Sequence, residues 1–128
     1  MAPTVIFGDI RGMDPEEIKP VLRKYGIKRL DTAAAYEMGE SERRTGNAHM
    51  AGEFVIDTKI LGGPLDSGAL HPDKVEESSQ KSLERLQTDQ VNVLYCHVPD
   101  SKTPLEDQAR GFDDIYKKGR FKEVSISG

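Results

Sequence analysis

Five short apolar segments, separated by longer helical stretches, constrain the fold of this chain more than any other feature. Several of the segments carry apolar residues at successive positions, as strands buried on both faces do. Connections of this length allow parallel crossovers between consecutive strands. We therefore predict one α/β domain over residues 1–128, with four strand–helix units followed by a fifth parallel strand. The predicted strands are residues 4–7, 28–30, 54–59, 91–96 and 122–127.

Helix signals fill the intervals between the strands. Asp14, a proline and two glutamates form a suitable helix start, although Pro20 should kink this helix or delay its beginning. A weaker helix is predicted from residue 41 to 44 and a little beyond, and clearer ones begin at Pro72 and near Pro104. The last helix should bury the apolar residues Leu105, Ala109, Phe112 and Tyr116.

Composition argues against several classes of function. The chain has 128 residues and a formal net charge of −4, from 18 Lys and Arg against 22 Asp and Glu. A protein that binds nucleic acid or an anionic membrane through electrostatics would carry a basic surplus instead. The apolar stretches are too short for a membrane span, the N-terminus lacks the features of a secretory signal, and the single cysteine, Cys96, excludes an internal disulfide. We expect a cytoplasmic protein with no nucleic-acid or membrane partner.

Ionisable residues gather at the ends of three predicted strands. Asp31 follows the second strand and Tyr36 lies five residues further on, Lys59 ends the third strand, and His97 follows the fourth. Each has a simpler explanation alone, since a lysine at a strand end is usually solvated and a lone histidine is more often structural. The carboxyl ends of parallel strands, however, meet at one rim. Their convergence there favours an acid–base cluster.

The chemistry of such a cluster follows from its residue types. A phenol titrates near about pH 10 and is a poor proton donor at neutral pH. A nearby ammonium such as Lys59 would stabilise the phenolate of Tyr36, and Asp31 would hold and balance that ammonium. His97 could bind the same substrate oxygen or relay a proton. The cluster could protonate a carbonyl oxygen or deprotonate an alcohol, and no metal-ligand spacing competes with it.

Three segments, in order, resemble signatures of the aldo-keto reductases: LDTAAAYEMGESE, VIDTKI and NVLYCHVPD. The resemblance makes Asp31, Tyr36, Lys59 and His97 the family's catalytic tetrad, with Tyr36 as general acid. The runs KSLERLQTDQVNVLYCHVPD and GRFKEVSISG are most similar to the aflatoxin-aldehyde-reductase branch. The implied fold is a partial (β/α)8 TIM barrel, of which this sequence supplies (βα)4 and a fifth strand as an open half-barrel.

The same resemblance implies NADPH as cofactor and a small carbonyl compound as substrate. Ser127 matches a serine that helps hold the nicotinamide, whereas Gly128 and Asp9 replace the family's usual asparagine and threonine. The family's strand-seven and strand-eight residues, which complete the cofactor site, have no counterpart among these 128 residues. We therefore do not expect this chain alone to bind NADPH strongly, and we expect no metal.

Three functions stay open from the sequence. The first is reduction of an aldehyde or ketone, if the missing half of the barrel is supplied. The second is a cofactor-independent acid–base enzyme, such as an isomerase, dehydratase or cyclase, that uses the same cluster. The third is an inactive remnant that serves as an interaction module.

An open half-barrel also predicts association. Five strands leave two sheet edges unpaired, and inward side chains face an open trough. Exposed apolar surface of this kind promotes assembly. We therefore predict a homodimer or larger oligomer, or a partner chain that completes the barrel. The side chains expected in the trough are Val5, Phe7, Val55 and Val93.

Overall fold

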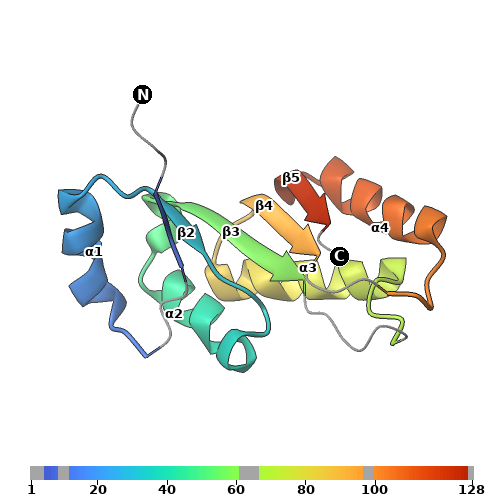
Figure 1. Ribbon diagram of the computed structural model, residues 1–128, viewed down its shortest axis with the longest axis horizontal. Helices are drawn as coiled ribbons and strands as arrows, with labels where there is room; N and C mark the ends of the chain where they lie inside the picture. Colours follow the sequence, from blue (N-terminus) through green and yellow to red (C-terminus); the bar gives the residue numbers. More distant parts are fainter. Residues whose placement is uncertain (1–4, 9–11, 61–66, 97–99, 127–128) are drawn as a thin grey trace.

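A single sheet of five parallel strands, paired in chain order, organises the protein (Figure 1). The computed structural model describes residues 5–8, 12–60, 67–96 and 100–126. The strands are β1 (Ile6–Phe7), β2 (Arg29–Asp31), β3 (Val55–Ile60), β4 (Val91–Cys96) and β5 (Phe121–Ile126). The helices are α1 (Pro15–Lys24), α2 (Glu40–Asn47), α3 (Pro72–Leu86) and α4 (Leu105–Lys117), with 3-10 turns at η1 (Tyr36–Gly39) and η2 (Met50–Gly52).

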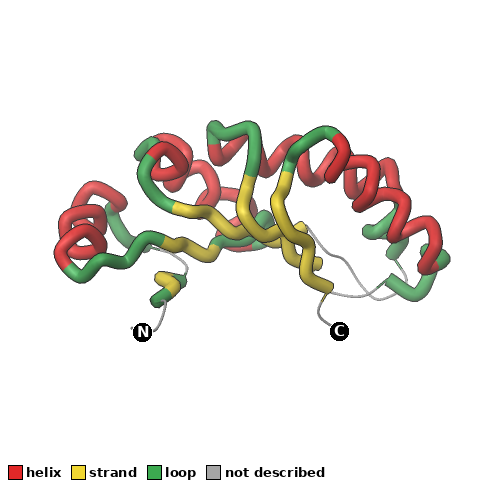
Figure 2. Tube along the Cα trace, turned by 90° about the horizontal axis from the view of Figure 1, so that it is seen from above, coloured by secondary structure: helices red, strands yellow, loops and turns green. Residues whose placement is uncertain are grey.

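This order confirms the predicted fold class, four strand–helix units followed by a fifth parallel strand. The helices lie on one face of the sheet, and no described helix covers the other, which we call the open face (Figure 2). An arrangement of this kind is part of a (β/α) barrel, whose helices form the outer layer.

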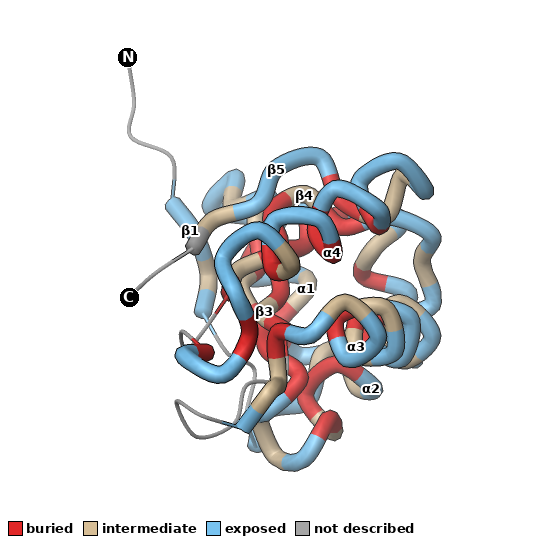
Figure 3. The backbone as a smooth tube through the Cα atoms, turned by 90° about the vertical axis from the view of Figure 1, so that its right-hand side faces the viewer, coloured by how far each residue is buried: buried red, intermediate tan, exposed pale blue. Residues whose placement is uncertain are grey.

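The hydrophobic core lies between the sheet and the helices. Leu30 of β2 and Ile56 of β3 are register partners, and both point into it. Leu22 of α1 and Leu86 of α3 are fully buried against the same cluster. Complete burial of one such side chain contributes about 1.5–3 kcal/mol. Figure 3 shows how burial differs between the strands: β3 is largely buried, whereas β1 at the edge of the sheet is more exposed.

Helix α1 begins at Pro15, so the expected delay at Pro20 does not occur. The Asp14 carboxylate accepts a hydrogen bond from the Glu16 amide at 3.0 Å and caps the first turn. Pro20 lies inside the helix and cannot donate to the carbonyl four residues earlier. Burial of Leu22 in the core offsets that lost hydrogen bond.

Helix α4 buries a different face from the one predicted. Leu105 is 75% exposed and Tyr116 is 53% exposed, and Ala109 is also exposed. The apolar residues of α4 cover a wider face than the part of the helix that contacts the core. Some of them border a groove of about 360 Å³ between α4 and β5 at the sheet edge. Only Phe112 of the predicted set is buried. The buried face of the helix is Gln108, Gly111, Phe112 and Ile115.

The open face is more polar than the predicted apolar trough. Phe7 pairs with Leu30 and packs against the core on the helix side, so its expected place was wrong. Val93 lies two residues before Tyr95 and faces away from the core as predicted, but it is only 5% exposed. Val55 and Val5 are exposed as expected. Because residues alternate along a strand, those facing away from the core on β2 to β4 include Arg29, Asp31, Val55, Asp57, Lys59 and Tyr95.

Candidate active site

Three of the predicted site residues meet at the carboxyl ends of β2 and β3. Asp31 is the last residue of β2, and Lys59 is next to last in β3. The Lys59 ammonium donates hydrogen bonds to Asp31 Oδ2 at 2.8 Å, to the Tyr36 hydroxyl at 3.1 Å and to the Thr32 carbonyl at 3.1 Å. An ammonium has three N–H donors, so these three acceptors engage all of them. The position of the lysine is therefore fixed from three directions.

The charge of Lys59 is stabilised by these partners. Burial of the side chain, 15% exposed, works against the charged form, but the hydrogen bonds to Asp31 and Tyr36 outweigh it and hold the pKa of Lys59 above its ordinary value. The lysine is consequently an ammonium throughout the neutral range. Its Nζ lies 4.8 Å from the centroid of the Tyr36 ring, which adds a cation–π contact.

An unusual turn carries Tyr36 to this position. The Ala34 amide donates to the Lys59 carbonyl at 3.2 Å, which continues the β2–β3 contact beyond the strand. After Tyr36, Glu37 and Met38 have φ values of 48° and 57°, in the left-handed region that side chains disfavour. Backbone strain of this kind persists only where the surroundings fix both ends of the turn.

A second ion pair lies on the same face, further from the carboxyl ends of the strands. Arg29 Nε donates to Asp57 Oδ2 at 2.6 Å, and Asp57 is 1% exposed. The other oxygen of Asp57 accepts from Asn92 Nδ2 at 3.0 Å and from the Val93 amide at 3.1 Å. The sequence did not reveal this pair, because its charges alternate with apolar residues along buried strands and carry no local motif. Tyr95, the register partner of Lys59, was missed for the same reason.

Two predicted residues, His97 and Ser127, lie outside the described part of the chain, as does Asp9. Within the described ranges, no group of three or more His, Cys, Asp or Glu side chains is arranged to hold a metal ion. None of the helices seen in those ranges is long and apolar enough to cross a membrane.

Comparison with known proteins identifies the family. Residues 8–128 match the sequence profile of the Aldo/keto reductase family. The chain belongs to this family. It is 36% identical over 126 residues to a probable voltage-gated potassium channel subunit beta of Arabidopsis thaliana, covering 90% of this chain and 38% of the relative. It is 29% identical over 136 residues to aflatoxin B1 aldehyde reductase member 2 of Mus musculus, covering 99% and 37%.

Solved structures place the fold in the same family. A thermostable aldo-keto reductase, solved with the inhibitor epalrestat, superposes with a TM-score of 0.78 at 25% identity, covering 99% of this chain and 50% of that one. The predicted family, including its aflatoxin-aldehyde-reductase relatives, is thus confirmed. The chain spans less than two fifths of the length of the two relatives named above.

Proposed function

We propose that this chain carries the proton-donating part of a carbonyl reductase, with Tyr36 as the general acid. The supporting observation is the Lys59 ammonium, which bridges Asp31 Oδ2 and the Tyr36 hydroxyl at 2.8 and 3.1 Å. The name of the mouse relative, an aldehyde reductase, favours an aldehyde or ketone as the substrate.

The roles of the three residues follow from their hydrogen bonds. When the phenol of Tyr36 gives its proton to a carbonyl oxygen, negative charge develops on the phenol oxygen, which already accepts a hydrogen bond from Lys59. The ammonium stabilises that charge in place before the reaction begins, so little reorganisation is needed. Asp31 holds the ammonium and prevents it from turning away to solvent. His97 stays the predicted second ligand of the substrate oxygen.

Reduction also needs a hydride, which NAD(P)H supplies in aldo-keto reductases. The described residues fit this cofactor only in part. The two open-face cations of β2 and β3, Arg29 and Lys59, are each paired with an aspartate and are not available to bind its phosphates. The predicted contact of Ser127 with the nicotinamide stays a proposal. We infer that residues beyond those described, from this protein or a partner, complete the cofactor site.

The decisive experiment is a Tyr36→Phe substitution, assayed by NADPH consumption with a panel of aldehydes and ketones. Loss of the general acid should lower kcat by about 10²–10⁴-fold. Tyr25→Phe is the matched control, because Tyr25 is 67% exposed at the C-terminal cap of α1, where its ring contacts Lys24 rather than Lys59. Unchanged turnover in Tyr36→Phe would remove Tyr36 from its assigned role.

A titration of the chain with NADPH tests the cofactor separately. Binding in the micromolar range would show that these residues hold more of the cofactor site than we infer. Absence of binding at millimolar NADPH, together with carbonyl turnover without any nicotinamide, would contradict the reductase proposal. The comparisons do not favour such cofactor-free chemistry.

A further inference from the structure

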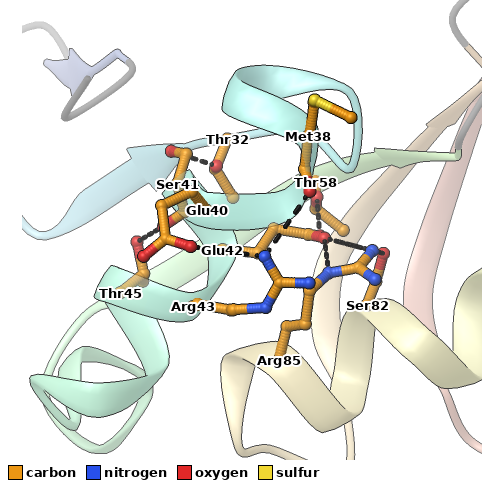
Figure 4. A network of polar contacts seen from close by, with 10 residues as sticks. All are labelled: Thr32, Met38, Glu40, Ser41, Glu42, Arg43, Thr45, Thr58, Ser82 and Arg85. Carbon is orange, nitrogen blue, oxygen red and sulfur yellow. Dashed lines mark hydrogen bonds and ion pairs between the residues drawn. The ribbon is translucent and has the colours of Figure 1, made fainter. Parts of the chain in front are cut away.

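Two neighbouring residues of α2, Ser41 and Glu42, contact the strands beside the reactive residues (Figure 4). The Ser41 hydroxyl lies 2.9 Å from the Thr32 hydroxyl. Thr32 directly follows Asp31, and its carbonyl is one of the three acceptors of Lys59. Helix α2 is thereby joined to the end of β2 by a buried hydrogen bond.

The contact of Glu42 is made to β3. The Thr58 hydroxyl donates to Glu42 Oε2 at 2.7 Å, and Thr58 directly precedes Lys59. Thr58 points toward the helices, because side chains alternate along the strand, while Lys59 points to the open face. The same two strands that carry Asp31 and Lys59 are therefore fastened to α2 from the opposite side of the sheet.

Glu42 is a buried charge with a dedicated partner. Its side chain has 0% exposure, and its Oε1 accepts from Arg85 Nε of α3 at 2.8 Å and from the Ser82 hydroxyl at 3.2 Å. A buried carboxylate is costly unless it is paired and hydrogen-bonded. Since only one placement of α2 satisfies these donors together, the charge fixes the helix relative to β3 and α3.

The turn between Tyr36 and α2 transmits that placement. It contains three successive residues with positive φ, namely 48° at Glu37, 57° at Met38 and 90° at Gly39. At its start the Tyr36 amide donates to the Ala33 carbonyl at 3.2 Å, and its end is the first turn of α2. Because this turn is short and hydrogen-bonded at its start, we expect a shift of α2 to move Tyr36.

We propose that Glu42 is a positioning residue that, through Thr58 and Arg85, keeps Tyr36 within hydrogen-bonding distance of Lys59. The link to catalysis rests on the proposed function, in which Tyr36 is the general acid. The link to geometry does not, because it concerns only the distance between the two side chains.

The test is a Thr58→Val substitution, which removes the hydrogen bond to Glu42 and leaves the Glu42–Arg85 pair intact. Thr45→Val is the matched control. Thr45 is also buried, but its hydroxyl donates to the Ser41 carbonyl within α2, so it does not join the helix to a strand. Nuclear magnetic resonance of the labelled chain gives two readouts: the Overhauser effect between the Tyr36 ring and the Lys59 side chain, and the titration of the Lys59 ammonium.

Thr58→Val should weaken the Tyr36–Lys59 Overhauser effect and bring the Lys59 titration midpoint down toward that of an ordinary lysine. In the active enzyme it should lower kcat at least about tenfold while KM changes little, as expected when a reacting group is misplaced. Thr45→Val should leave all three unchanged. A purely stabilising role for Thr58 would lower the unfolding midpoint of Thr58→Val and move none of these readouts.

Glu42→Gln is a second and stronger perturbation of the same contacts. If Glu42→Gln does not fold, the result for Thr58→Val alone decides the proposal. The proposal is overturned if Thr58→Val folds with the wild-type Overhauser effect and Lys59 titration. The two proposals fail separately. An active Tyr36→Phe enzyme would overturn the assigned chemistry, yet a weakened Tyr36–Lys59 contact in Thr58→Val would still establish the positioning role.

Discussion

Two side-chain ion pairs join β2 to β3 on the open face. The acid and the cation exchange strands between the two pairs. At the carboxyl end the acid, Asp31, is on β2 and the cation, Lys59, is on β3. At the other pair the cation, Arg29, is on β2 and the acid, Asp57, is on β3. One pair is proposed to serve catalysis. The other lies among buried strands and has a purely structural explanation.

The raised pKa of Lys59 predicts a loss of stability at alkaline pH. A group whose pKa is higher in the folded state contributes stability that is fully present below the unfolded pKa, about 10.4 for lysine, and is lost as the pH rises through the folded value. The free energy of unfolding should therefore begin to fall once the pH rises above about 10, the ordinary range of a lysine. Denaturant titrations across this range would measure it, with Lys59→Met showing a smaller fall. Equal slopes for the two proteins would contradict this interpretation.

Arg29→Met should destabilise the chain by about 3 kcal/mol, because it leaves the carboxylate of Asp57, 1% exposed, without its cation. Chemical denaturation measures the change. Arg23→Met is the control, since Arg23 and Glu53 form an exposed pair whose removal should matter little. Similar losses in the two variants would show that burial of Asp57 does not decide the cost.

Helix α2 is the element on which the site depends most. It is short and mostly polar, so its own sequence gives it little reason to form in isolation. Packing against α3 compensates for this low intrinsic tendency to form a helix. The two helices approach closely at Gly46, where a Cβ would lie 2.0 Å from the Arg85 carbonyl oxygen. Gly46 thus permits the close approach of α2 and α3, and the Glu42–Arg85 ion pair joins the same two helices.

Gly46→Ala should separate α2 from α3 and destabilise the chain by about 1–3 kcal/mol or more, as overpacking does. Thermal unfolding would report the change. Gly52→Ala is the control, because a Cβ there meets nothing within 4 Å. A wild-type unfolding midpoint in Gly46→Ala would mean that the helices separate without cost.

At the scale of the whole molecule, exposed apolar residues lie at both edges of the sheet, whereas the exposed Val55 of the open face lies among charged residues. Val5 and Ile6 are 54% and 45% exposed at β1. Val124 of β5 and Tyr116 of α4, 41% and 53% exposed, border the groove at the opposite edge. Pairing at the edges is therefore a better route to association than packing of two open faces, which carry charged pairs.

We predict that the chain forms a homodimer or larger oligomer, and that Val124→Lys weakens this association by placing a charge on the β5 edge. Light scattering coupled to gel filtration would measure the mass. Val21→Lys is the control, since Val21 is 53% exposed on α1, away from the groove. A monodisperse wild-type monomer at high concentration would contradict the prediction.

The sequence by itself determined the order of strands and helices, the fold class and the family. It also indicated that Asp31, Tyr36 and Lys59 would meet. These conclusions rest on local information: runs of apolar residues, helix starts, and motifs at the ends of parallel strands, which the topology brings to one rim.

Only the tertiary structure decided which surfaces are buried and which charges are paired. Glu42 meets Arg85 across 43 residues and Arg29 meets Asp57 across 28, and no local pattern marks either pair. The buried face of α4 and the place of Phe7 likewise depend on what packs against them. Burial and ion pairing are relations between distant segments, so their outcome is set when the helices and the sheet come together.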